Sequence, residues 1–147
     1  LTNKCTGPAF GRPVIRGVNF RMYEALREHN GDTLGEGVGK KIVRDLELKL
    51  DLELPIDYRN YLIACNYAEL YGDPLFGIHC ENTEIDIYAR NHGEEHFRYG
   101  FLAIFANDID GEVFLRPDSG AIYNAAFQKP IARSFNEFVE LLLSQGS

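Results

Sequence analysis

His92 and His96 lie four residues apart with Glu94 and Glu95 between them, a pattern that could bind a metal ion. A zinc-protease helix needs Glu directly after its first His, because that carboxylate acts as the general base. Gly93 stands at that position, so the segment is more typical of a solvated loop. The sequence therefore predicts no metal ion and no other cofactor.

Three acids gather in Asp108-Ile-Asp-Gly-Glu112. A calcium loop would place Gly sixth, and the sixth residue counted from Asp108 is Val113. General acid–base catalysis needs a matched pair of groups in a pocket. Asp110-Gly111 is instead typical of a hairpin turn, so these acids are expected to form a turn and to charge the surface.

Ser119 and Ser134 have neither the strand-to-helix elbow of a nucleophile nor an adjacent base. We therefore expect a protein that is not an enzyme. A hydrolase or metal protein that uses His79, His92 or His96 with the acids of 108–112 is the less favoured alternative.

The segment Gly35-Glu-Gly-Val-Gly-Lys-Lys41 resembles a phosphate-binding loop only superficially. The Walker spacing needs a glycine five positions before the Gly-Lys pair, where Leu34 stands. It also needs Ser or Thr after the lysine, where Lys41 stands. A flexible connector is the better interpretation.

The stretch 54–66 predicts the helix around which the rest of the chain is organised. Pro55 suits the first turn of a helix, and Asp57 follows near the positive end of the helix dipole. One apolar face recurs at helical spacing and consists of Tyr58, Tyr61, Leu62 and Cys65. We expect an amphipathic core helix that does no chemistry.

Three further helices are expected around this one. Apolar spacing predicts a helix over residues 18–29 and another over residues 38–50. The second segment also continues as leucines in strand-like alternation, and we favour a helix to about Leu50 with an extended lead into Pro55. The capping box Ser134-Phe-Asn-Glu137 predicts the start of the last helix.

Five short segments have strand character, and turn residues separate the later ones. They are residues 75–79, 85–88, 101–106, 112–116 and 121–123. Helices first, then strands, then a closing helix indicate an α+β fold. A length of 147 residues fits one domain, in which residues 1–17 would form a loosely ordered arm.

The charge is unevenly distributed along the chain. Residues 1–44 carry eight Lys or Arg against four Asp or Glu, whereas residues 45–147 carry seven against eighteen. An acidic body disfavours nucleic acid as a partner and is compatible with a basic protein partner. Acidic surfaces also keep proteins soluble, which is the simpler explanation of such a charge.

Cys5, Cys65 and Cys80 are an odd number without close spacing, so neither a disulfide framework nor a zinc knuckle is predicted. The sequence shows no apolar run long enough to span a membrane and no signal peptide. We expect a cytoplasmic protein that makes no membrane contact.

Two blocks of sequence together resemble the SUKH superfamily. The first runs from Ile42 through Leu54-Pro55 to Asn66, and matches that family's helix–Leu-Pro–helix signature. The second runs from Phe101 to Phe138 and contains Phe101-Leu-Ala-Ile-Phe-Ala-Asn-Asp108 and the opening of the last helix. The blocks cover roughly residues 40–143. One departure is Tyr67 after Asn66, where the family commonly has glycine, so the turn there must differ.

This resemblance implies an α+β domain with a mixed or antiparallel, curved sheet flanked by helices. Bacterial members are mostly immunity proteins that bind and silence a toxin, often a nuclease. Fungal members regulate cell-wall glucan synthesis and act as protein-interaction hubs. The resemblance thus implies binding rather than catalysis.

Charge and resemblance together lead to the hypothesis of a non-enzymatic immunity protein that binds a basic toxin domain. A regulatory protein-binding scaffold of the glucan-synthesis type is the alternative. Tyrosines surrounded by acids suit an interface. The predicted partner-binding residues are Tyr67, Tyr71, Asp73, Asp108, Asp110 and Glu112. Packing of these tyrosines on the sheet is an equally favoured interpretation.

Overall fold

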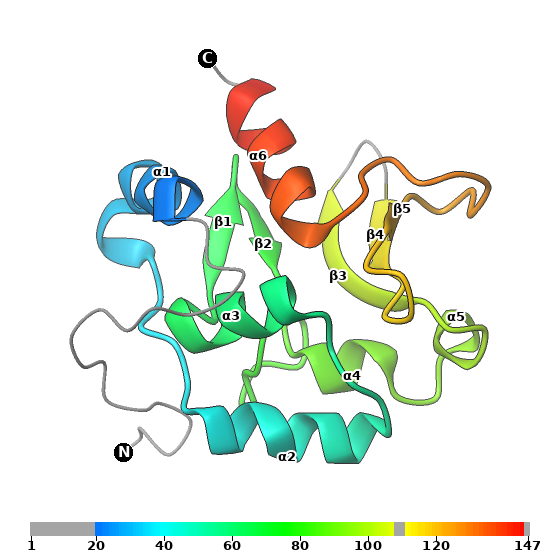
Figure 1. Cartoon of the computed structure of the whole chain (residues 1–147). Coiled ribbons are helices and arrows are strands. Elements are labelled where there is room, and N and C mark those ends of the chain that lie inside the picture. The colour runs from blue at the N-terminus through cyan, green and yellow to red at the C-terminus, as the bar shows by residue number, and fades with distance from the viewer. Residues whose placement is uncertain (1–19, 108–110, 146–147) are drawn as a thin grey trace.

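The computed structural model describes residues 20–107 and 111–145 (Figure 1). The described helices are α1 (Phe20–Asn30), the 3₁₀ turn η2 (Gly31–Thr33), α2 (Lys40–Leu50), α3 (Ile56–Ala64), α4 (Ile87–Asn91), α5 (Glu95–Arg98) and α6 (Phe135–Gln145). The strands are β1 (Ala68–Leu70), β2 (Asp73–Leu75), β3 (Leu102–Asn107), β4 (Gly111–Leu115) and β5 (Ile122–Tyr123). The predicted α+β class is confirmed.

The five strands form one open antiparallel sheet in the order β1-β2-β3-β4-β5. The pairing of β3 with β4 shifts register between Ala103 and Phe105. Helices α3 and α6 cross in front of the sheet in Figure 1, and Phe138 of α6 packs edge-on against Phe105, with ring centroids 5.6 Å apart. Helices α4 and α5 interrupt the predicted succession of strands.

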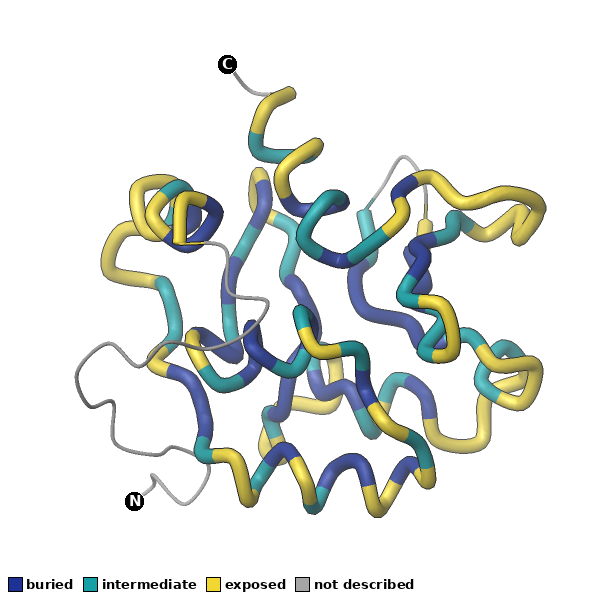
Figure 2. The backbone as a smooth tube through the Cα atoms, viewed as in Figure 1, coloured by how far each residue is buried: buried dark blue, intermediate teal, exposed yellow. Residues whose placement is uncertain are grey.

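Helix α3 lies at the centre of the core, as predicted. All four residues of its expected apolar face are buried: Tyr58, Tyr61, Leu62 and Cys65. The Tyr58 hydroxyl donates a hydrogen bond to the carbonyl oxygen of Phe76 at 2.6 Å, which satisfies its polar atom inside the core. Figure 2 shows that buried backbone runs from this helix into the sheet.

The segment before α2 is held against α3, which corrects the expected flexible connector. The amides of Gly35, Gly37 and Val38 donate to carbonyls at the C-terminal end of α3 and just beyond it, at 2.8, 3.0 and 3.0 Å. A Cβ on Gly37 would lie 2.0 Å from the carbonyl oxygen of Ile63. Glycine is therefore needed for close packing of two backbones rather than for flexibility.

Asn66 makes the turn that follows α3. Its φ of +61° lies in the left-handed region, which asparagine tolerates better than most residues. Its side-chain amide donates to the carbonyl of Ile78 at 2.9 Å and accepts from the amide of Ile78 at 2.8 Å. A Cβ on Gly77 would lie 2.1 Å from the Asn66 carbonyl oxygen. The turn thus joins the end of α3 to the chain that leaves β2.

The segment 85–88, expected as a strand, becomes the start of α4. Asp86 caps this helix, because its Oδ2 accepts from the amide of Ala89 at 3.0 Å. Only an isolated parallel bridge pairs Gly77 with Asp86. The expected strand 75–79 is misplaced, since β2 runs from Asp73 to Leu75 and shares only Leu75 with it, and β1 was not predicted.

The turn between α2 and α3 confirms the expected break at Leu50. Asp51 follows with a φ of 58° and closes the helix through its amide. The buried carboxylate of Glu47 accepts from the amide of Leu54 at 2.8 Å and from the guanidinium of Arg59 at 3.0 Å. These charge-assisted hydrogen bonds of Glu47 fix the path of the chain between α2 and α3.

The capping box predicted at the start of α6 forms one of its two expected hydrogen bonds, and the other is shifted by one residue. The Ser134 hydroxyl accepts from the amide of Glu137 at 3.1 Å. The Glu137 carboxylate reaches back to the amide of Arg133 at 2.6 Å, one residue earlier than a capping box requires. Phe135, Phe138 and Val139 point into the core, as predicted.

Asn66→Ala is expected to lower the free energy of unfolding by about 2–4 kcal/mol, because two buried backbone groups of Ile78 lose their partners. Urea unfolding followed by circular dichroism measures this loss. Asn66→Gly is the control: it also loses both hydrogen bonds but accepts the left-handed φ, so it should be less destabilised than the alanine variant. Equal stability of Asn66→Ala and the wild type would contradict the assigned role of this turn.

Candidate functional site

Tyr67 precedes β1 and is only partly exposed. Its hydroxyl donates to the Glu69 carboxylate, and its ring meets the His79 ring edge-on, with centroids 5.7 Å apart. Burial and the hydrogen bond to Glu69 raise the pKa of Tyr67 to about 12. The Tyr67 hydroxyl is therefore hydrogen-bonded within the protein. This agrees with the alternative prediction, in which the tyrosines pack on the sheet and do not bind a partner.

Tyr71 lies in the turn between β1 and β2 and leaves half of its surface exposed, at 50%. Its amide donates to Nε2 of His29 at 3.1 Å, and its hydroxyl donates to the carbonyl of Leu143 at 3.1 Å. Tyr71 therefore joins α1 and α6 while half of its surface stays exposed. Asp73 follows at the start of β2 and is partly buried.

The acidic half of the predicted site lies on the next hairpin. Leu75 pairs with Phe105 in the antiparallel sense, so the β1–β2 turn lies at the same end of the sheet as the last residues of β3 and the first residues of β4 (Figure 1). Asp108 and Asp110 lie outside the described residues. Glu112 of β4 is partly buried and forms an ion pair with Arg90, with an N–O distance of 3.0 Å. Its charge is therefore partly neutralised.

The three histidines of the alternative prediction have separate surroundings. Nε2 of His79 lies 3.0 Å from the Asn66 carbonyl oxygen, and Nε2 of His96 lies 2.9 Å from Oδ1 of Asn91. The ring of His92 stacks on Tyr88. Within residues 20–107 and 111–145, no group of three or more His, Cys, Asp or Glu side chains is placed to hold a metal ion.

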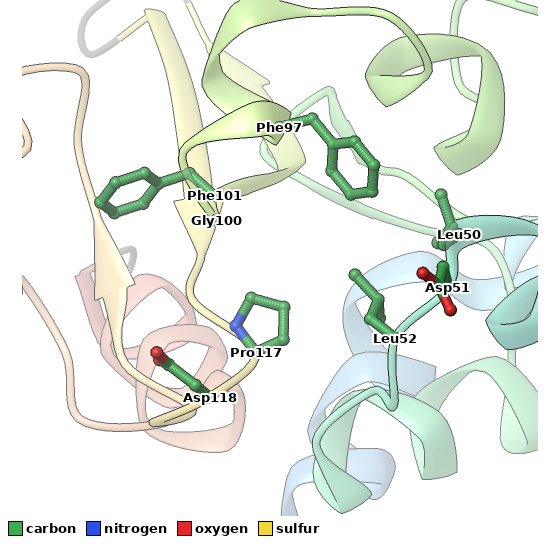
Figure 3. A pocket seen from close by; sticks show the side chains of 8 residues that line it. All are labelled: Leu50, Asp51, Leu52, Phe97, Gly100, Phe101, Pro117 and Asp118. Carbon is green, nitrogen blue, oxygen red and sulfur yellow. The ribbon is translucent and has the colours of Figure 1, made fainter.

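A hollow of about 320 Å³ lies at the other end of the fold, where the α2–α3 turn approaches α5 and the β4–β5 turn. Figure 3 shows Phe97 and Pro117 on one wall facing Leu50 and Leu52 on the other, with Asp51 beside Leu50. The complete lining is Leu50, Asp51, Leu52, Phe97, Gly100, Phe101, Pro117 and Asp118.

A second hollow of about 280 Å³ adjoins the first and shares Asp51 and Leu52 with it. Its lining is Arg44, Glu47, Leu48, Asp51, Leu52 and Glu53. We call residues 51–53 the inter-helix turn, since it separates the two hollows. Together the linings contain four carboxylates and one guanidinium, so this surface is acidic around apolar walls.

Two of these four carboxylates already have partners. Glu47 pairs with Arg59, and Asp118 pairs with Arg116. Asp51 and Glu53 are exposed and have no ion-pair partner among the described residues. The inter-helix turn therefore offers two free charges to a partner.

Sequence reasoning did not predict this surface, because its lining comes from three separate segments. One signal was present in the sequence. Leu48 lies outside the apolar face of α2, which is formed by Val43, Leu46 and Leu50. In the structure Leu48 is 69% exposed. Leu48 lines the second hollow, next to the two unpaired acids of the inter-helix turn.

Comparison with known proteins leaves the family of this chain unassigned: no family model matches it, and no curated sequence matches it significantly. None of the described helices combines the length and apolar character needed to cross a bilayer.

Stability is expected to fall as the pH drops below about 6.5, with a contribution from His79. Burial lowers the pKa of His79 from its ordinary 6.5, against smaller opposing effects of Asn66 and Asp86. The folded state therefore binds a proton less readily than the unfolded state, so this contribution is complete above pH 6.5 and is lost below it.

Urea unfolding at a series of pH values from 8 to 5 measures this effect, with pH steps of about 0.5 across the ordinary histidine pKa. His79→Gln should show a smaller loss of stability on acidification than the wild type. His92→Gln, which changes an exposed ring, should keep the wild-type slope. An unchanged slope in His79→Gln would contradict the prediction.

Proposed function

We propose that this chain is a non-enzymatic immunity protein that binds a basic toxin domain, such as a nuclease, one-to-one in the cytoplasm and silences it. One observation carries the proposal: most exposed carboxylates have no ion-pair partner among the described residues. They are Glu24, Glu28, Asp32, Glu36, Asp51, Glu53, Glu81, Glu84, Glu94 and Glu95.

Unpaired surface acids favour rapid association with a basic protein. A nuclease gathers positive charge around its active site because it must grip phosphates. An acidic protein is steered toward such a site and can cover it, and salt screens the attraction. The same field repels nucleic acid, which is therefore not proposed as a partner.

The resemblance of the Leu54-Pro55 block and of the Phe101–Phe138 block to the SUKH superfamily is the second support. Immunity to a toxin is the common role of that superfamily's bacterial members. A binding role requires no catalytic residues, and none of the predicted site residues is proposed to act chemically.

A regulatory protein-binding scaffold is the second candidate. It is favoured by exposed apolar side chains at different places in the fold, since Tyr71 lies on the β1–β2 turn whereas Leu48 lies on α2 and Tyr99 follows α5. A scaffold that binds several partners needs separate surfaces, whereas an inhibitor needs only one.

The test is capture from the native cell lysate at low salt, followed by expression of each captured protein with and without this chain. The proposal predicts one basic partner that arrests growth when expressed alone and is neutralised at equimolar amounts. Several neutral or acidic partners, or a basic partner without toxicity, would contradict immunity and would favour the scaffold.

Removal of two unpaired charges should slow association with the captured partner. Glu24→Gln combined with Glu28→Gln is expected to lower the association rate about two- to fivefold at low salt and to leave the dissociation rate unchanged, because distant charges act by steering. Stopped-flow mixing measures both rates. The control combines Thr83→Ser with Gln128→Asn, which changes two exposed residues without altering charge. Equal rates in all three proteins would contradict steering.

A further inference from the structure

The hollow beside the inter-helix turn is large enough to receive one protruding side chain. Its volume of about 320 Å³ lies at the lower end for small-molecule sites. Its walls, Phe97 and Pro117 against Leu50 and Leu52, are apolar (Figure 3). Walls of this kind favour an aliphatic or planar group that packs between them.

The unpaired acid that lines this hollow determines which charge an incoming side chain should have. The amide of Asp51 donates to the carbonyls of Glu47 and Leu48, which fixes the backbone of this residue at the end of α2, and its side chain lines the hollow. Glu53, two residues later, is also unpaired but lines the second hollow. A cation at the tip of the incoming side chain would therefore complement Asp51.

Among the described residues, the one guanidinium in the linings of the two hollows is that of Arg44, and it lines the second, on the other side of Asp51. It is exposed on α2, so solvent screens its effect on the first hollow. Of the two carboxylates that line the first hollow, Asp118 is already paired with Arg116. Asp51 is therefore the lining carboxylate that is left for an incoming cation.

The protein itself shows how this surface holds a guanidinium. Arg116 lies over the ring of Phe101, 4.8 Å from its centroid, and its Nε lies 3.2 Å from Oδ1 of Asp118. An aromatic ring and a carboxylate together thus bind one cation at the edge of the hollow. Phe97 and Asp51, which also line the hollow, are likewise an aromatic ring and a carboxylate.

We propose that this hollow receives an arginine or lysine side chain of the basic partner, with an adjacent apolar residue packed on its walls. The identity of the partner rests on the proposed function, whereas the chemistry of the hollow does not. The partner would insert its aliphatic stem between Leu52 and Phe97 and place its charge at Asp51.

A peptide probe tests the hollow without any toxin. The acetylated, amidated peptide Leu-Arg-Leu-Arg-Leu is titrated into the ¹⁵N-labelled chain, and amide shifts are followed by NMR. The proposal predicts shifts concentrated at residues 50–53, 97–101 and 117–118. Shifts spread over all acidic segments, no shifts, or an equal response to Ser-Arg-Ser-Arg-Ser would overturn it.

Asp51→Asn provides the sharper test, because asparagine tolerates the left-handed φ of 58° and so preserves the turn. It should weaken peptide binding about three- to fivefold, the effect of losing one exposed charge pair. Asp32→Asn removes the same charge from another exposed site and should leave binding within about 1.5-fold. Equal weakening by both variants would overturn the assignment.

The two proposals fail in distinguishable ways. If the peptide binds the hollow but no toxin is captured, the immunity function fails and the receptor hollow stands. If a toxin is captured and neutralised but Asp51→Asn neither weakens peptide binding nor weakens the toxin complex, the hollow fails and the immunity function stands.

Discussion

The left-handed turn at Asn66 is the constraint on which the rest of the structure depends. Helix α3 ends just before it, and carbonyls at the end of α3 and just beyond it accept the amides of Gly35, Gly37 and Val38. The side chain of Asn66 meanwhile holds Ile78 through two hydrogen bonds. One turn thereby places the segment before α2, the end of α3 and the chain beyond β2 relative to one another. Gly37, Val38, Asn66 and Ile78 are buried, so losing their partners would be costly.

That constraint also explains the departure from a glycine after Asn66. The positive φ falls on Asn66 itself, so the next residue, Tyr67, needs no glycine. The glycines required for close approach are instead Gly35, Gly37 and Gly77, each of which would place a Cβ within 2.3 Å of a carbonyl oxygen. Packing of backbone on backbone decides where glycine is needed, and the sequence alone does not show which backbones meet.

Helical periodicity allowed most of the helices and their buried faces to be predicted, because the spacing of Tyr58, Tyr61 and Leu62 depends only on local geometry. The segment 85–88 was predicted wrongly, since its alternating apolar residues fit a strand while Asp86 caps a helix. Local hydrogen bonding by one aspartate outweighed a short apolar pattern. The extent of β2 depends on its distant neighbour β3 and could not be predicted locally.

The candidate site was harder to predict than the fold. Acids and tyrosines near one another in sequence indicated the two hairpins, but Tyr67 bonds to Glu69, and Glu112 bonds to Arg90. The inter-helix turn gains its hollow only when α5 and the β4–β5 turn fold against it. A site assembled from three segments leaves little local signal beyond an exposed Leu48.

Hydrogen–deuterium exchange of the purified complex with the captured partner is the most direct test of binding through the acidic inter-helix turn. The structure leads us to expect slowed exchange at residues 48–53, 97–101 and 117–118, with little change at residues 67–73. Slowed exchange confined to residues 67–73 and 111–112 would contradict this account and would return the interface to the two hairpins.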